Sequence, residues 1–314
     1  MTPIAAARMA SGGTSLADGP ARPGRGRLAG TAVALVSVVG IGALWQVFVR
    51  SRTGQLLDAA VLDGAQYGRT RLWRLAEPVL DVISVPFIAA VLLAAVVLAL
   101  VRRQWLLTVQ VALLMAGANL TTQLLKHAVL ERPDLGLGDR VVNTMPSGHT
   151  TAAASCAVAL VLVVPRRMRP LTAALGAVYT AGTGMATVIG GWHRPSDVVA
   201  AMLVVLAWAG LVSALRPTGP PAIVSHRRRE TSTISMLLAL GLVAGAAAGV
   251  AVQRTALALQ ENEHVTLLDG LESRADLLTA YGGGALGITA SSLMAFGILL
   301  LLLRGHEPKI TAAR

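Results

Sequence analysis

The sequence predicts an all-α fold: a polytopic membrane helix bundle with a six-span core and two additional C-terminal spans. Three observations lead to this prediction. Of the 314 residues, 54% are hydrophobic and 14% are charged, whereas soluble domains carry about 25% charged residues. The apolar residues are gathered in runs of about 20, the length that a helix needs to cross a bilayer. The charged residues cluster between these runs, and the runs themselves lack polar faces.

Eight apolar runs are predicted to be membrane spans. The fourth run is short, but its helix can begin earlier, at Pro146 or Ser147. In chain order the runs are Leu28–Val49, Ile83–Val101, Trp105–Leu125, Thr150–Val164, Leu171–Gly190, Val198–Leu215, Ile234–Val252 and Leu286–Leu303.

The spans divide the chain into five parts. The N-terminal part is rich in Ala, Gly, Pro and Arg, a composition typical of disorder. Three prolines and the run Arg227–Arg229 mark a linker after the sixth span. The parts are a disordered basic N-terminal tail (1–27), the six-span core (28–216), a basic cytoplasmic linker (217–233), two extra transmembrane helices (234–303) and a cytoplasmic tail (304–314).

The segment between the first two spans is expected to lie on the membrane surface. Leu56–Leu80 is predicted to form an amphipathic helix at the interface. Its acidic residues, Asp58, Asp63 and Glu77, partly offset the positive charge of the same loop.

The basic residues indicate the orientation of the bundle. With the N-terminus in the cytoplasm, alternation of the spans places most basic clusters on that side, as the positive-inside rule requires. We therefore expect a multi-pass protein of the cell membrane with both termini cytoplasmic. This placement accounts for the net charge of +11 and speaks against a nucleic-acid partner. The clusters are Arg8, Arg22, Arg25 and Arg27, then Arg102 and Arg103, then Arg166, Arg167 and Arg169, then Arg216 and Arg227–Arg229, and finally Arg304, Lys309 and Arg314.

Three polar clusters lie where spans meet the opposite, extracytoplasmic side: Lys126–Asp134, Pro146–Thr150 and Trp192–Asp197. Ionisable residues at such a boundary either snorkel to the interface or serve a function. In the first cluster, Lys126 and Arg132 either are snorkelling helix ends or form a phosphate clamp, in which arginine offers two parallel donors.

The second cluster has the pattern of a helix start that binds anions. Ser147 is a candidate N-cap, and Gly148 leaves the backbone N–H groups of the first turn accessible to an anion. His149 in that turn would face the anion. A plain helix start, with His149 at the interface, is the alternative interpretation.

The third cluster contains a histidine and a carboxylate at helical spacing. His193 and Asp197 are four residues apart, so Asp197 can hold one tautomer of the imidazole and raise its basicity. A structural pair that caps the helix is the alternative. Taken together, the clusters supply the groups that phosphoryl transfer requires: cations, a nucleophile with its orienting carboxylate, and an acid for the leaving group.

These residues resemble the motifs of the type 2 phosphatidic acid phosphatase superfamily, which includes lipid phosphate phosphatases and vanadium haloperoxidases. The first motif, a lysine followed by Arg-Pro, is matched by Lys126, Arg132 and Pro133. The second, Pro-Ser-Gly-His, is complete at 146–149, and the third, His-x-x-x-Asp, is matched at 193–197. The resemblance covers roughly residues 59–215, the phosphatase-like core without the last two spans.

The resemblance implies a role for each matched residue. His193 would form a phosphohistidine, Asp197 would orient it, and His149 would protonate the leaving group. No metal or other cofactor is implied. The residues that would hold the phosphoryl oxygens are Lys126, Arg132, Ser147 and Gly148.

Two positions depart from the family pattern. Five residues separate Lys126 from Arg132, where the family has six. The third motif usually has Ser-Arg six to seven residues before its histidine, and here Ala186 and Thr187 occupy those positions. A phosphate-binding cation is therefore missing, and Arg194 and Arg140 are candidates to replace it.

The function expected from sequence is a membrane phosphatase that hydrolyses a lipid phosphate or diphosphate at an extracytoplasmic site. A prenyl diphosphate, a prenyl-linked sugar phosphate and phosphatidic acid all fit, because the headgroup stays in water and the tail in the bilayer. The alternatives are a catalytically inactive family member acting as a transporter or scaffold, and a phosphotransferase that passes the phosphate to another alcohol.

Overall fold

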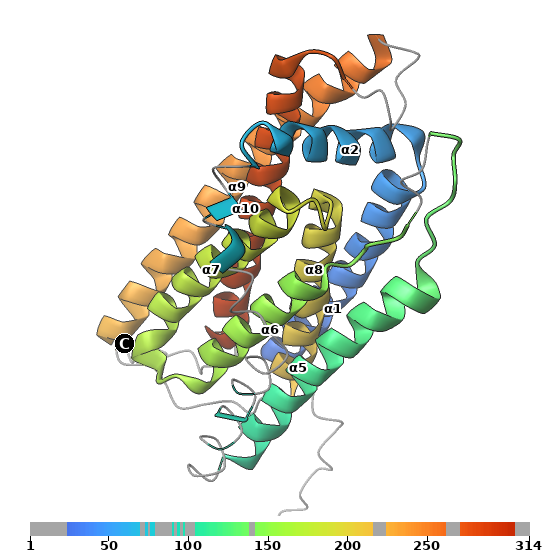
Figure 1. The fold of residues 1–314 in the computed structure, drawn as a ribbon. Helices are drawn as coiled ribbons and strands as arrows, with labels where there is room; N and C mark the ends of the chain where they lie inside the picture. The colour runs from blue at the N-terminus through green and yellow to red at the C-terminus, as the bar shows by residue number, and fades with distance from the viewer. Residues whose placement is uncertain are drawn as a thin grey trace, which may run out of the picture.

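The computed structural model describes residues 24–69, 73–74, 76–78, 90, 93–94, 97, 104–137, 142–215, 224–261 and 271–304. Within these ranges all regular structure is helical and no strand occurs. The long helices stand side by side, and one shorter helix crosses the end of the bundle (Figure 1). The prediction of an all-α helix bundle is confirmed.

From α5 to α10, successive helices run in opposite directions along the bundle (Figure 1). Two of them end in a π-helical turn, at Trp45–Val49 and at Leu125–Val129, and a short 3-10 turn, Arg166–Met168, precedes a third. The helices are α1 (Arg25–Leu44), α2 (Arg52–Gln66), α5 (Trp105–Leu124), α6 (Gly148–Val163), α7 (Arg169–Ile189), α8 (Pro195–Ala214), α9 (Val224–Glu261) and α10 (Arg274–Arg304).

Six of these helices are long and apolar enough to cross a membrane, and α6 is a shorter apolar helix. The chain is therefore a multi-pass membrane protein. Seven of the eight predicted spans appear as helices. The remaining one, Ile83–Val101, lies almost entirely outside the described residues.

The last two helices are longer than the sequence predicted. α9 begins at Val224, so it runs through much of the segment expected to be a linker, and α10 begins at Arg274 instead of near Leu286. α10 packs against α2, α7 and α8 as well as against α9. The two additional helices are therefore packed into the bundle with the other helices.

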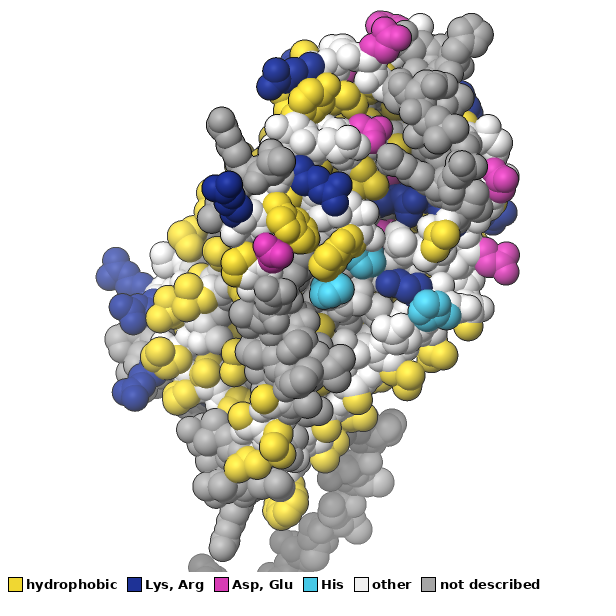
Figure 2. Space-filling model, in the orientation of Figure 1, with side chains coloured by type: hydrophobic (Ala, Val, Ile, Leu, Met, Phe, Trp, Pro, Cys, Tyr) yellow, Lys and Arg dark blue, Asp and Glu magenta, His cyan; other side chains and the backbone are white. Residues whose placement is uncertain are grey.

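α6 and α8 lie inside the bundle, and most of their residues are buried. α1 and α9 instead expose large apolar side chains, among them Leu35, Val39 and Val243. Such outward-facing apolar surface suits a helix that contacts lipid. Figure 2 shows hydrophobic side chains along the flank of the molecule, acidic and basic ones toward its upper end, and a separate group of basic ones at the lower left.

α2 is the helix that crosses the end of the bundle (Figure 1). Its N-cap is Ser51, whose Oγ accepts a hydrogen bond from the Gly54 amide at 2.9 Å. Leucines, alanines and valine of one face are buried, and so is Asp58. Gly64 contacts α10 so closely that an added Cβ would lie 2.1 Å from the Leu277 carbonyl oxygen, so this crossing requires a glycine. The helix ends at Gln66, earlier than the predicted Leu80.

Candidate active site

The three polar clusters meet at the end of the bundle that α2 crosses. The first cluster follows α5, the second begins α6, and the third connects α7 to α8. These helix ends lie together beneath α2 (Figure 1). Histidine side chains reach the surface there next to basic ones (Figure 2).

The turn before His193 is a Schellman motif. Gly191 has φ +72°, a conformation that glycine adopts without strain. Its amide donates to the Val188 carbonyl, and the Trp192 amide donates to the Thr187 carbonyl, both at 2.9 Å. The His193 amide also donates to Thr187, at 3.3 Å. The end of α7 therefore places the backbone of His193 directly before α8.

Asp197 is the acceptor around which the third cluster is built. Its Oδ2 accepts hydrogen bonds from Thr144 Oγ1 at 2.6 Å and from the Arg194 amide at 2.9 Å, and it lies 3.3 Å from His193 Nδ1. The bond from Arg194 caps the N-terminus of α8. Asp197 therefore both caps α8 and contacts His193. The structural interpretation of this pair is confirmed, and the catalytic role of Asp197 stays a prediction.

The second cluster is joined to the third by its backbone. The Ser147 amide donates to the Asp197 carbonyl at 3.0 Å. Ser147 is the N-cap of α6, because its Oγ accepts from the Thr150 amide at 3.3 Å. The His149 ring in the first turn lies 6.4 Å from the His193 ring and 5.4 Å from the Trp192 ring, measured between centroids. Two histidines and the start of a helix thus face one another.

The first cluster begins in the π-helical turn that ends α5. Such turns are frequent at functional sites. Lys126 lies in this turn and interacts electrostatically with Asp197 and His149. Asn143 joins the first and second clusters, because its side-chain amide donates to the carbonyls of Lys126, Leu130 and Met145 at 2.8–3.2 Å.

Arg132 is 8% exposed and lies within electrostatic range of Arg194, Asp58 and Asp197. Burial, together with the positive charge of Arg194, lowers the pKa of Arg132 to about 10, so the guanidinium stays protonated at neutral pH. Its loop is tied to α2, since Gln55 Nε2 donates to the Pro133 carbonyl at 3.1 Å.

Arg194 and Arg140 were the two candidates to replace the missing third-motif cation, and the structure describes only Arg194. Arg194 is buried, and its Nη1 donates to Thr144 Oγ1 at 2.8 Å and to the Val142 carbonyl at 3.4 Å. It borders a pocket that also touches His193. Arg140 lies outside the described residues. The structure thus brings Lys126, Arg132, Ser147, Gly148, His149, His193, Arg194 and Asp197 to one end of the bundle.

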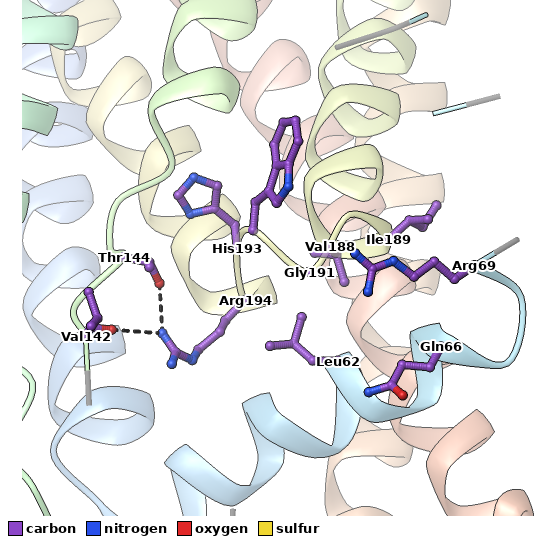
Figure 3. A pocket seen from close by; sticks show the side chains of 11 residues that line it. Leu62, Gln66, Arg69, Val142, Thr144, Val188, Ile189, Gly191, His193 and Arg194 are labelled. Carbon is purple, nitrogen blue, oxygen red and sulfur yellow. Dashed lines mark hydrogen bonds between the residues drawn. The ribbon is translucent and has the colours of Figure 1, made fainter. Parts of the chain in front are cut away.

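A pocket of about 370 Å³ opens beside His193 and Arg194 (Figure 3). α2 contributes one wall, and the loop before α6 and the end of α7 contribute the others. Among the lining residues that the structure describes, two are arginines and none is acidic. The lining residues are Leu62, Gln66, Arg69, Val142, Thr144, Val188, Ile189, Gly191, Trp192, His193 and Arg194.

Sequence reasoning missed four residues of this region: Asp58, Arg69, Asn143 and Thr144. Asp58 lies on the buried face of α2, and an acidic residue among the apolar positions of an amphipathic helix was a signal that was available. The other three owe their position to contacts with distant segments, and no motif marks them.

Fold and site together define a multi-pass membrane protein with basic and imidazole side chains around a buried His–Asp pair. Residues 107–220 match the family model of the PAP2 superfamily, and this stretch contains all three clusters. This match supports the interpretation of the motifs, that this region resembles the type 2 phosphatidic acid phosphatase superfamily. No curated protein and no solved structure matched the chain.

The match supports phosphatase activity on a phosphate-containing substrate. Among the described residues, no group of three or more His, Cys, Asp or Glu side chains is arranged to hold a metal ion.

Proposed function

We propose that the protein hydrolyses a lipid phosphate or diphosphate through a phosphohistidine on His193. One observation carries this proposal: the imidazole of His193 lies 3.3 Å from Asp197, and its ring faces that of His149 at 6.4 Å. A histidine whose Nδ1 is held by a carboxylate has its Nε2 available as a nucleophile.

The reaction would proceed in two steps. Nε2 of His193 attacks phosphorus, the bond from phosphorus to the leaving oxygen breaks, and His149 donates a proton to that oxygen. Water then attacks the phosphorus of the phosphohistidine and gives its proton to His149. The P–N bond breaks, inorganic phosphate leaves and His193 is restored.

Charge on the phosphoryl oxygens requires donors and cations around them. Lys126, Arg132 and the first-turn amides of α6 after Ser147 and Gly148 supply these in our proposal. Lys126 interacts electrostatically with His149, and Arg132 with Asp197, which supports their presence around the same centre. Arg194 donates a hydrogen bond to Thr144. In our proposal it therefore forms part of the pocket wall and is not one of the residues that hold the phosphoryl group.

The membrane setting favours an amphiphilic substrate. The clusters lie at the ends of spanning helices, where a lipid places its headgroup.

We further propose that this end is extracytoplasmic and that both termini are cytoplasmic. The start of α1, the turn between α6 and α7 with Arg166 and Arg167, and the end of α10 lie at the opposite end of the bundle (Figure 1). A reporter that fluoresces only in the cytoplasm tests this orientation. It should fluoresce when fused after Arg304 and stay dark when inserted at Gly136.

The test of function is phosphate release by the purified protein from lipid monophosphates and diphosphates. The wild type should release phosphate, and His193→Ala should lower the rate by at least about a thousandfold. His127→Ala is the matched control, because His127 is an exposed histidine in the same π-helical turn as Lys126. Acid-labile, base-stable labelling of the wild type and not of His193→Ala would support the intermediate. Equal phosphate release by wild type and His193→Ala would exclude the proposed mechanism.

A further inference from the structure

Arg69 stands on the wall of the pocket beside His193, although no motif contains it. It follows α2, and its Nη2 donates to the Gly190 carbonyl at 2.6 Å. Its guanidinium atoms lie 3.7–3.9 Å from the position of a Cβ on Gly191. In Figure 3, the side chain of Arg69 extends toward Gly191, whereas that of Arg194 extends toward Thr144 and Val142 on another wall of the pocket. The two arginines, with no acidic side chain among the described lining residues, make this pocket suited to an anion.

The positions where the family carries its third-motif arginine do not face this pocket. Thr187 is fully buried, and its Oγ1 donates to the Gly184 carbonyl at 2.7 Å. Ala186 is also buried and packs against Trp73. The Trp73 ring contacts the Trp192 ring edge-on, at 5.8 Å between centroids. Trp73, which follows α2 in the chain, therefore packs at the end of α7 beside Gly190 and Trp192.

Arg69 is held beside the site by its hydrogen bond to the Gly190 carbonyl. A guanidinium has five N–H donors, so the bond to the Gly190 carbonyl leaves others to bind an anion. α2 itself is anchored on the first turn of α8, because Asp58 accepts hydrogen bonds from Ser196 Oγ at 2.5 Å and from the Ser196 amide at 3.4 Å.

We infer that Arg69 is a substrate-binding residue that contacts phosphate oxygens in this pocket and supplies the cation absent from the third motif. The inference rests on the proposed phosphatase function. The anion would be either the reacting phosphoryl group or, in a diphosphate, the phosphate next to it.

The test compares Arg69→Gln, Arg69→Lys and the control Arg74→Gln, whose side chain is exposed on the same segment and does not line the pocket. kcat/KM is measured for a monophosphate and a diphosphate that share one lipid tail. Arg69→Gln should lose roughly tenfold to a hundredfold on at least one of them, the usual effect of losing a charged hydrogen bond. Arg69→Lys should retain part of the activity, and Arg74→Gln should stay within about twofold of wild type.

The loss of kcat/KM in Arg69→Gln on the two substrates shows which phosphate Arg69 contacts. Equal losses on both substrates assign Arg69 to the reacting phosphoryl group, and a larger loss on the diphosphate assigns it to the neighbouring phosphate. Activity of Arg69→Gln within about twofold of wild type on both substrates, or an equal loss in Arg74→Gln, overturns the inference while the proposed function stands.

Binding of pyrophosphate, measured by calorimetry on the same proteins, tests Arg69 without turnover. Arg69→Gln should bind roughly tenfold more weakly than wild type, at an unchanged melting temperature. If the wild type hydrolyses no lipid phosphate, the proposed function fails. Pyrophosphate affinity then still decides the inference, and equal affinities would refute it.

Discussion

Ser196 donates a hydrogen bond to Asp58 at 2.5 Å, and both side chains are buried. This contact joins α2 to the first turn of α8, one residue before Asp197. The helix that crosses the end of the bundle is therefore tied directly to the helix that carries the partner of His193. Four predictions follow from this and neighbouring contacts.

Asp58→Asn should change how stability depends on pH. Burial, and then the negative charge of Asp197, raises the pKa of Asp58 to about 7, against the opposing effects of Ser196 and Arg194. Between about pH 4 and pH 7 the folded protein therefore holds a proton that the unfolded chain releases. The stability that Asp58 contributes is present at low pH and is lost as the pH rises to about 7, by up to about 4 kcal/mol.

Asparagine keeps the acceptor for Ser196 but has no charge to bury. The melting temperature of Asp58→Asn in detergent, relative to wild type, should therefore rise between pH 5 and pH 8. Glu77→Gln, at an exposed position, serves as the control. A difference between Asp58→Asn and wild type that stays constant with pH would contradict the buried, protonated carboxyl.

Asp197→Asn should impair catalysis far more than stability. An amide at this position can still accept the hydrogen bond that caps α8, but it cannot stabilise a charged imidazole on His193. By comparison with other His–carboxylate pairs, kcat should fall roughly 10²- to 10⁴-fold. Phosphate release and the melting temperature are measured together, with Asp134→Asn on the exposed loop as the control. A kcat within about threefold of wild type would remove Asp197 from the mechanism.

Thr144→Val should show how much the hydroxyl between Asp197 and Arg194 contributes. The hydroxyl donates to Asp197 and accepts from Arg194, and valine has the same shape without either bond. We expect kcat/KM to fall about tenfold, corresponding to about 1–2 kcal/mol. Thr144→Ser keeps the hydroxyl and should remain near wild type. If serine is as impaired as valine, the methyl group matters and the hydroxyl does not.

Gly64→Ala should destabilise the crossing of α2 over α10. The added Cβ would lie 2.1 Å from the Leu277 carbonyl oxygen, so the backbone of one helix must shift. We expect a loss of about 1–3 kcal/mol and a lower melting temperature in detergent. Gly282→Ala is the control within α10, because nothing lies within 4 Å of its added Cβ and alanine favours helix. Equal melting temperatures for the two variants would show that the contact is not close.

Much of the fold was predictable because apolar length is a local property. Seven of the eight predicted spans appear as helices, since about 20 apolar residues form a helix in a bilayer whatever their neighbours are. The ends were less predictable. α9 extends back to Val224 through a basic segment, because helical hydrogen bonds do not require apolar side chains.

The site, like the fold, has a part that was predictable from the sequence and a part that was not. The sequence by itself determined the parts that span a few residues: the proximity of His193 to Asp197 at the start of α8, and the cap that Ser147 makes on α6. His193 directly precedes the N-cap of α8 and Asp197 lies in its first turn, so the two side chains meet within a segment of five residues.

Only the tertiary structure decided which distant side chains join them. Asp58 meets Ser196 across 138 residues of chain, and Arg69 reaches the Gly190 carbonyl across 121. Such contacts depend on how helices cross and pack, and the periodicity of a single segment contains no information about them.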